Sequence, residues 1–250
     1  MAEDLSAVDV AFAALAEFDW GKDAKALQPI DEAVVACQGR PAARADLEAR
    51  LVAVLSQPTS RAAKEYICRK LCLIGTAACV PAVASLLPQA EHSHMARYAL
   101  ERIAEQPAAE ALRVAVDTVP DALKIGMISS LAARGDAQSV PMIAAVLDRA
   151  AKAGQTRLAV AAADALGQLQ TAEAIAALEA ADASDPTVAA AVINARLATA
   201  EGLLAVQQLA QARSIYQSLL TAAAGKPAAR AVELAATRGL LACAEAQAAS

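Results

Sequence analysis

The feature that most constrains this chain is one helical sequence pattern that occurs four times in its middle half. In each copy a leucine lies in a first apolar segment, and a turn follows it. The position nine residues after the leucine lies in a second apolar segment. Successive leucines are 29, 31 and 35 residues apart. A helical pair of this length buries its apolar face only against the next pair, so the pattern predicts an α-solenoid. The four steps run from Leu71 to Val80, Leu100 to Ala109, Leu131 to Val140 and Leu166 to Ile175.

Composition favours an all-α chain. Hydrophobic residues make up 57% of the 250 residues but aromatic residues only 2%, so alanine and the aliphatic residues must supply the core. Alanine has the highest helix propensity. The apolar residues recur at steps of three and four rather than in alternation, as expected for helices and not for strands. The chain is long enough for one extended array or two small globules, and the continuous repeat favours one array.

Net charge and cysteine content limit the partners and the cellular compartment that we expect for this chain. The net charge of −5 argues against binding to nucleic acid or to an anionic membrane. Charged residues interrupt the long apolar runs, so we expect no membrane span, and the N-terminus lacks the basic segment of a secretory signal. The five cysteines are scattered and odd in number, which favours reduced thiols over a disulfide framework. We therefore expect a cytoplasmic monomer without a cofactor.

The N-terminal segment, residues 1–60, matches the repeat poorly. Its apolar spacing predicts helices at residues 5–20 and 29–38 around a turn at Gly21, then a third helix from Pro41 to Leu55. A repeat array needs a terminal segment whose outer face is polar and contacts water. We therefore interpret this segment as an N-terminal cap.

The repeats occupy residues 61–184. Ser60 or Thr59 is placed to cap the first helix, Gly75 is placed to end it, and Val80-Pro81 begins its partner. Residues 127–147 repeat this arrangement almost letter for letter.

The pattern changes in residues 185–250. Alanine and tyrosine stand four apart at Ala212 and Tyr216, an arrangement similar to one tetratricopeptide-type helical pair. A final helix over residues 227–246, with Leu234, Leu240 and Leu241 turned inward, is expected to close the array. Caps and repeats together predict one continuous array with three segments.

The segments Leu71-Cys72-Leu73-Ile74-Gly75 and Leu166-Gly167-Gln168-Leu169-Gln170 resemble the end of the first helix in HEAT repeats, especially short bacterial HEAT-like repeats. The resemblance covers residues 61–182. It implies a right-handed α-solenoid of stacked antiparallel helical hairpins, with capping helices at both ends. The family's basic residue near the start of the first helix is matched by Lys64 and Lys124, but the other two copies lack it.

Few residues have the spacing of a catalytic or metal site. Cys68 and Cys72 lie one helical turn apart, and His92 and His94 could add two ligands, but the cysteines also fit the apolar pattern of a helix core. Ser93 between the histidines fits a helix N-cap. Glu101 and Glu105 read as neighbours on one solvated helix face. No catalytic or metal site is assigned.

Arg134 is the clearest departure from the repeat, because the other copies have isoleucine or leucine at its position. One interpretation is a charge at a helix C-terminus whose side chain extends into solvent. The other is a ligand-contacting strip formed by Arg134 and Asp136 together with Arg97 and Tyr98 one repeat earlier. Both interpretations stay open.

Three functional classes follow. A non-catalytic scaffold that binds a protein or peptide fits the repeat architecture and the scarcity of catalytic combinations. The HEAT resemblance also implies two alternatives, a bilin lyase and, less favoured, an alkylpurine DNA glycosylase. Few aromatic residues are present for a tetrapyrrole or an extruded base, and Trp20 lies outside the repeats. We therefore expect a scaffold and not an enzyme.

Overall fold

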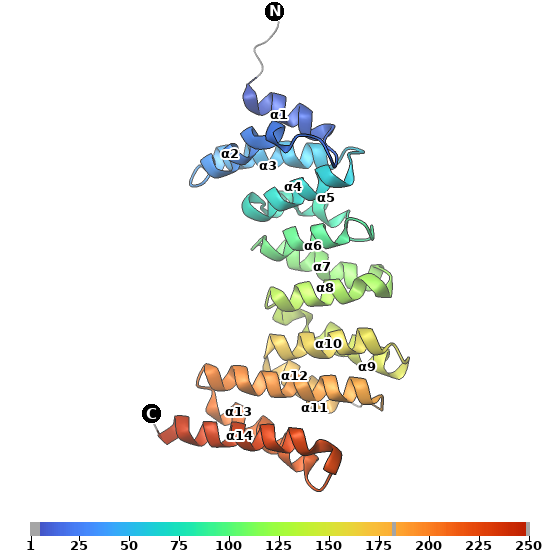
Figure 1. The fold of residues 1–250 in the computed structure, drawn as a ribbon, viewed down its shortest axis with the longest axis vertical. Helices are drawn as coiled ribbons and strands as arrows, with labels where there is room; N and C mark the ends of the chain where they lie inside the picture. The colour runs from blue at the N-terminus through green and yellow to red at the C-terminus, as the bar shows by residue number, and fades with distance from the viewer. Residues whose placement is uncertain (1–5, 182–183, 249–250) are drawn as a thin grey trace, which may run out of the picture. The chain divides into compact units, whose positions relative to one another are not determined.

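The computed structural model describes residues 6–181 and 184–248. Across these residues the chain forms fourteen α-helices, four short 3-10 helices and no strand (Figure 1). The prediction of an all-α chain is confirmed. The chain divides into two compact units, Met1–Arg134 and Gly135–Ser250, called unit 1 and unit 2. The predicted segment boundaries, after residues 60 and 184, both fall between helices.

Unit 1 consists of eight α-helices and two 3-10 helices among its described residues. Their bounds are α1 Ala7–Ala16, η1 Ala24–Leu27, α2 Gln28–Ala36, α3 Pro41–Leu55, α4 Arg61–Ile74, η2 Ala77–Cys79, α5 Val80–Ala84, α6 Ser93–Arg102, α7 Gln106–Thr118 and α8 Asp121–Ala133.

Helices of unit 1 contact their neighbours in the chain, and several also contact the helix two positions further along. Helix α6 lies between α4 and α8, while α5 contacts both α3 and α7 (Figure 1). The pattern leucines Leu71, Leu100 and Leu131 of α4, α6 and α8 are each 0% exposed. The predicted register of these leucines is confirmed, because each faces a helix-to-helix contact and not water.

Local signals set several ends of these helices. The Ser60 hydroxyl accepts a hydrogen bond from the Ala63 amide and caps α4, and Gly75 is the C-cap of the same helix. Helix α3 has the predicted bounds, with Pro41 in its first turn, where a missing N–H costs little. Expected helix 5–20 is wrong at its C-terminal end, since α1 stops at Ala16. The carbonyl of Phe18 instead accepts a hydrogen bond from the Ser60 hydroxyl, which holds the chain outside the helix.

Unit 2 consists of six α-helices and two 3-10 helices among its described residues. Their bounds are η3 Ala137–Ser139, α9 Val140–Lys152, α10 Thr156–Leu169, α11 Ala172–Ala180, α12 Pro186–Ala205, α13 Leu209–Ala223, η4 Pro227–Ala229 and α14 Arg230–Ala248.

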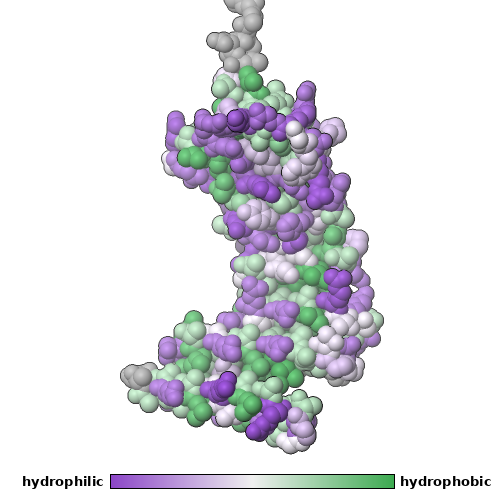
Figure 2. Space-filling view, viewed as in Figure 1, coloured by the Kyte–Doolittle hydropathy of each residue, from purple (hydrophilic) through white to green (hydrophobic). Residues whose placement is uncertain are grey.

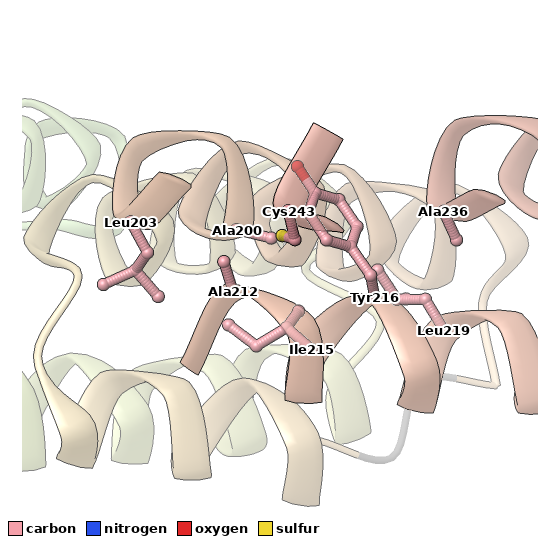
Figure 3. Close-up of a cluster of buried hydrophobic side chains, with 8 residues drawn as sticks. All are labelled: Ala200, Leu203, Ala212, Ile215, Tyr216, Leu219, Ala236 and Cys243. Atoms are coloured by element: carbon pink, nitrogen blue, oxygen red, sulfur yellow. The ribbon is translucent and has the colours of Figure 1, made fainter. Parts of the chain in front are cut away.

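The core of unit 2 follows the same order of contacts. Helix α12 packs on α10, α11, α13 and α14, and α9 packs on α10 and α11. Leu166 of α10, the fourth pattern leucine, is 0% exposed. Figure 3 shows the cluster that joins α12, α13 and α14, with Tyr216 directed from α13 toward Cys243 of α14. Gly239 of α14 gives the tyrosine ring its space, because a Cβ there would lie 2.2 Å from Cζ of Tyr216.

The inward orientation expected for three leucines of the last helix is wrong for two of them. Leu234 is 49% exposed and Leu241 is 61% exposed. The packed face of α14 instead follows Ala236, Gly239 and Cys243, which are spaced three and four apart. Leu240 lies beside that face and is partly buried against the cluster.

One helix corrects the expectation that no segment is long and apolar enough to cross a membrane. Helix α12, Pro186–Ala205, has 20 residues and a mean hydropathy of 1.4 in its most apolar window. A core helix of a globular unit passes the same test of length and composition, and α12 buries residues such as Val188, Ala195 and Leu203 against its neighbours. Its apolar composition thus matches its packing inside unit 2.

Candidate binding site

A pocket of about 590 Å³ opens in unit 1 beside α3. Its long wall is one face of that helix, formed by small or aliphatic residues three or four positions apart. The loop before α3 and the turn after α4 form the other walls. The wall on α3 includes Pro41, Ala45, Ala49 and Val52, and the turn contributes Thr76 and Ala78.

A buried carboxylate holds the turn that forms one wall. Glu48 of α3 is only 3% exposed. Its Oε1 accepts hydrogen bonds from the amide of Thr76 at 2.7 Å and the amide of Cys79 at 3.1 Å. The Thr76 hydroxyl donates to the same carboxylate at 2.9 Å. Hydrogen bonds to an ionised acceptor are stronger than neutral ones, so Glu48 fixes the turn against α3.

The charge of Glu48 also affects the neighbouring thiol. Burial, followed by the hydrogen bond and the negative charge of Glu48, raises the pKa of Cys79 to about 12. Cys79 therefore stays a neutral thiol near pH 7, and its sulfur donates to the Thr76 carbonyl at 3.2 Å. The Cys79 thiol thus takes part in the hydrogen bonding of the turn, and a neutral thiol is a weaker nucleophile than a thiolate.

Two arginines give the pocket a positive side. Arg44 is half-buried, and its Nε and Nη2 donate to the carbonyls of Ile74 at 2.6 Å and Gly75 at 2.8 Å. These are carbonyls at the end of α4, where the helix has no partners of its own for them. Arg40 is exposed just before α3, and its side chain makes no ion pair or hydrogen bond with the described part of the chain. Glu48 is the single acidic residue in the lining and its carboxylate is directed at the turn, so the two arginines leave the pocket with an excess of positive charge.

Arg97 of α6, a predicted contact residue, connects two helices. Its Nη1 donates to the Gly126 carbonyl at 3.1 Å and to the Ser130 hydroxyl at 3.0 Å, both on α8. The Ser130 hydroxyl donates to Glu101 of α6 at 2.6 Å. A Cβ at Gly126 would lie 2.6 Å from the guanidinium carbon, so this glycine permits the close approach. Burial lowers the pKa of Arg97 from its usual range, and the Glu101 carboxylate opposes that effect.

Arg134 is the C-cap of α8, so its predicted place at a helix end is confirmed. Its side chain does not extend into solvent as one interpretation expected. Nη1 donates to the carbonyl of Ile103 at 2.5 Å and also to the carbonyl of Leu100, at the end of α6. Weaker contacts reach other carbonyls of residues 101–105. The guanidinium therefore satisfies carbonyls of α6, one repeat earlier, rather than those of its own helix.

The other two predicted contact residues have local roles. The guanidinium of Arg102 lies 4.5 Å from the centre of the Tyr98 ring, a cation–π contact on α6. The carbonyl of Asp136 accepts hydrogen bonds from the amide and the hydroxyl of Ser139 in the turn before α9. The structure thus connects Arg97 and Arg134 through α6 and α8, and the ligand-contacting strip stays a prediction.

The cysteines and histidines are not arranged as a metal site. Among residues 6–181 and 184–248, no three or more histidines, cysteines and carboxylates are grouped to hold a metal ion. Cys68 is fully buried, and burial raises its pKa to about 12.

The expected N-cap at Ser93 is wrong, because α6 begins at Ser93 and His92 precedes it. The Ser93 hydroxyl is buried and has no hydrogen-bond partner.

The pairing of Glu101 with Glu105 on one helix is also wrong. Helix α6 ends at Arg102, and Glu105 stands before the first residue of α7. The chain leaves the helix at Ile103, whose backbone is extended and whose side chain is 2% exposed. The two carboxylates therefore lie on either side of a bend, although their spacing fits one helix.

The pocket beside α3 was not predicted from the sequence. One signal for it is present, since Glu48 lies on the same helix face as Leu51 and Leu55. A carboxylate in an apolar stripe requires hydrogen-bond donors in the fold. The sequence does not say which donors these are, because Thr76 and Cys79 lie 28 and 31 residues away.

Neither a scan against protein-family models nor a search of curated proteins found a match to this chain. The resemblance to HEAT repeats therefore rests on the repeated residues of the sequence itself.

Proposed function

We propose that this chain is a HEAT-like α-solenoid with helical caps that acts as a non-catalytic scaffold and binds a protein or peptide partner. One observation carries the proposal: side-chain hydrogen bonds repeatedly join residues 28 to 34 positions apart, in both units. A repeat of about 30 residues, with each pair stabilised by the next, accounts for that spacing. Examples are Arg44 to Ile74, Ser130 to Glu101, Thr156 to Asp185 and Thr199 to Gly167.

The order of helix contacts supports the same proposal. Contacts between α4, α6 and α8, and between α10, α12 and α14, join first helices of successive pairs within each unit. Contacts of α5 with α7 and of α9 with α11 join their second helices. Each unit thus contains two parallel series of helices, and such series leave elongated surfaces free for a partner.

Both units also carry exposed apolar side chains that a protein partner would cover. Among the described residues, several large hydrophobic side chains are more than half exposed. Figure 2 shows apolar and polar residues intermixed on the visible face of each unit. Such mixed surfaces are typical of non-obligate protein interfaces. The exposed side chains include Trp20, Val35, Leu73 and Val114 in unit 1 and Val206 and Leu241 in unit 2.

A display library of protein fragments from the organism that encodes this chain tests the proposal. The immobilised protein should enrich a small set of fragments over an unrelated helical bait of similar net charge. Their binding to the protein in solution should then be measurable by fluorescence anisotropy. No enriched fragment would contradict the scaffold, and a red-shifted absorption band on incubation with a bilin would then favour the bilin-lyase alternative.

A further inference from the structure

The geometry points to the pocket beside α3 as the site that binds a peptide segment carrying an apolar side chain next to a carboxylate. This inference rests on the proposed scaffold function and names the partner chemistry of one site. A volume of about 590 Å³ lies within the range of ligand pockets, about 300–1,000 Å³. The volume is sufficient for more than one side chain of a bound segment.

The walls select for an apolar side chain. Pro41, Ala45, Ala49 and Val52 present small or aliphatic groups in a line along α3. These residues are too small to fill the space in front of them, and this face lacks the packing that covers Leu47, Leu51 and Val54 on the same helix. An apolar side chain of a partner gains burial there.

The arginines select for a carboxylate. Arg40 is exposed at the edge of the pocket and has no ionic partner among the described residues. Arg44 uses Nε and Nη2 for the carbonyls of Ile74 and Gly75, which leaves Nη1 for a ligand. A guanidinium binds a carboxylate with charge-assisted hydrogen bonds in a fixed geometry.

The carboxylate of Glu48 does not cancel the preference of the pocket for a carboxylate ligand. Glu48 is buried, and its carboxylate is held by the amides of Thr76 and Cys79 and by the Thr76 hydroxyl. These donors occupy the carboxylate and keep it directed at the turn. The two arginine charges outnumber the one carboxylate charge among the lining residues, so the pocket favours a negatively charged ligand.

Pooled fluorescein-labelled octapeptides test the inference directly. Two adjacent positions are fixed as Leu–Glu, Leu–Gln or Ser–Glu, and the other positions are randomised. The wild-type protein should bind the Leu–Glu pool about tenfold more tightly than either other pool, the difference expected from one lost ion pair or one lost apolar contact. Equal binding of the Leu–Glu and Leu–Gln pools would overturn the inference.

Matched variants locate the binding. Arg40→Gln should weaken Leu–Glu binding and narrow its preference over the Leu–Gln pool, because Arg44 alone then remains for the carboxylate. Arg69→Gln, at an exposed position on α4, should change nothing. Ala45→Phe should fill the pocket and abolish binding, whereas Ala43→Phe, also exposed on α3 but outside the pocket, should bind as wild type. Circular dichroism confirms that each variant is folded.

Two failures are distinguishable. If the enriched protein fragments bind wild type and Ala45→Phe equally well, the pocket inference fails and the scaffold stands. If no fragment binds the wild-type protein, the scaffold proposal itself fails.

Discussion

Replacement of Glu48 by alanine is expected to be among the most destabilising changes on the surface of the pocket. The carboxylate accepts hydrogen bonds from three donors, two amides and one hydroxyl, while Glu48 is 3% exposed. Hydrogen bonds to charged groups contribute roughly 1.5–3 kcal/mol each, and a buried donor left without a partner costs roughly 1–3 kcal/mol. Because the adjacent pocket admits water and the carboxylate regains hydration on unfolding, the net loss should be about 2–4 kcal/mol.

Urea unfolding followed by far-UV circular dichroism measures that loss, and amide hydrogen exchange locates it. The amide of Thr76 should lose protection in Glu48→Ala, and the amide of Cys79 should lose less because it also donates to the Thr76 carbonyl. Glu48→Gln, which keeps one acceptor oxygen, should lose about half as much free energy of unfolding. Glu110→Ala on α7 is the control, because this exposed residue should stay within about 0.5 kcal/mol. A loss below about 1 kcal/mol in Glu48→Ala, with the Thr76 amide still protected, would refute the reasoning.

Three further predictions concern packing and the thiols. Leu166 is 0% exposed, so Leu166→Ala should lower the free energy of unfolding by about 2–5 kcal/mol. Leu241 is 61% exposed, so Leu241→Ala should lower it by less than about 0.5 kcal/mol. Equal effects of the two substitutions would contradict the assigned register. Gly239→Ala should lower the midpoint temperature of unfolding, because its Cβ would lie 2.2 Å from the Tyr216 ring. The same substitution should lower that midpoint less in a protein that also carries Tyr216→Leu. The Cys68 thiol, with its pKa raised to about 12 by burial, should resist iodoacetamide at about pH 8 in the folded protein and react after denaturation; rapid labelling of the folded protein would contradict this.

Short-range signals made the helical framework predictable. Proline in the first turn set the start of α3 at Pro41, and the hydroxyl of Ser60 set the start of α4. The four pattern leucines were predicted as core residues from spacing alone, and all four are buried. Caps and helical periodicity depend on residues a few positions apart, which is why the sequence is sufficient for them.

Contacts between distant residues were not predictable. Arg134 was expected at a helix end, but its acceptors, at the end of α6, are about 30 residues earlier in the chain. The same distance separates Glu48 from its donors, so the pocket was missed. Leu234 and Leu241 were placed inward because every leucine of α14 was treated as core, whereas neighbouring helices cover only one face. In each case the partner helix, and not local spacing, decides the outcome.

If each helical pair depends on the pairs next to it, Leu100→Ala should change amide hydrogen exchange in neighbouring helices and not along the whole chain. Leu100 of α6 is fully buried, and α6 contacts α4, α5, α7 and α8. Faster amide exchange relative to wild type should be largest in α6, smaller in α4 and α8, and absent from α13 and α14 of unit 2. Uniformly faster exchange along the whole chain would show a single cooperative core and contradict the account.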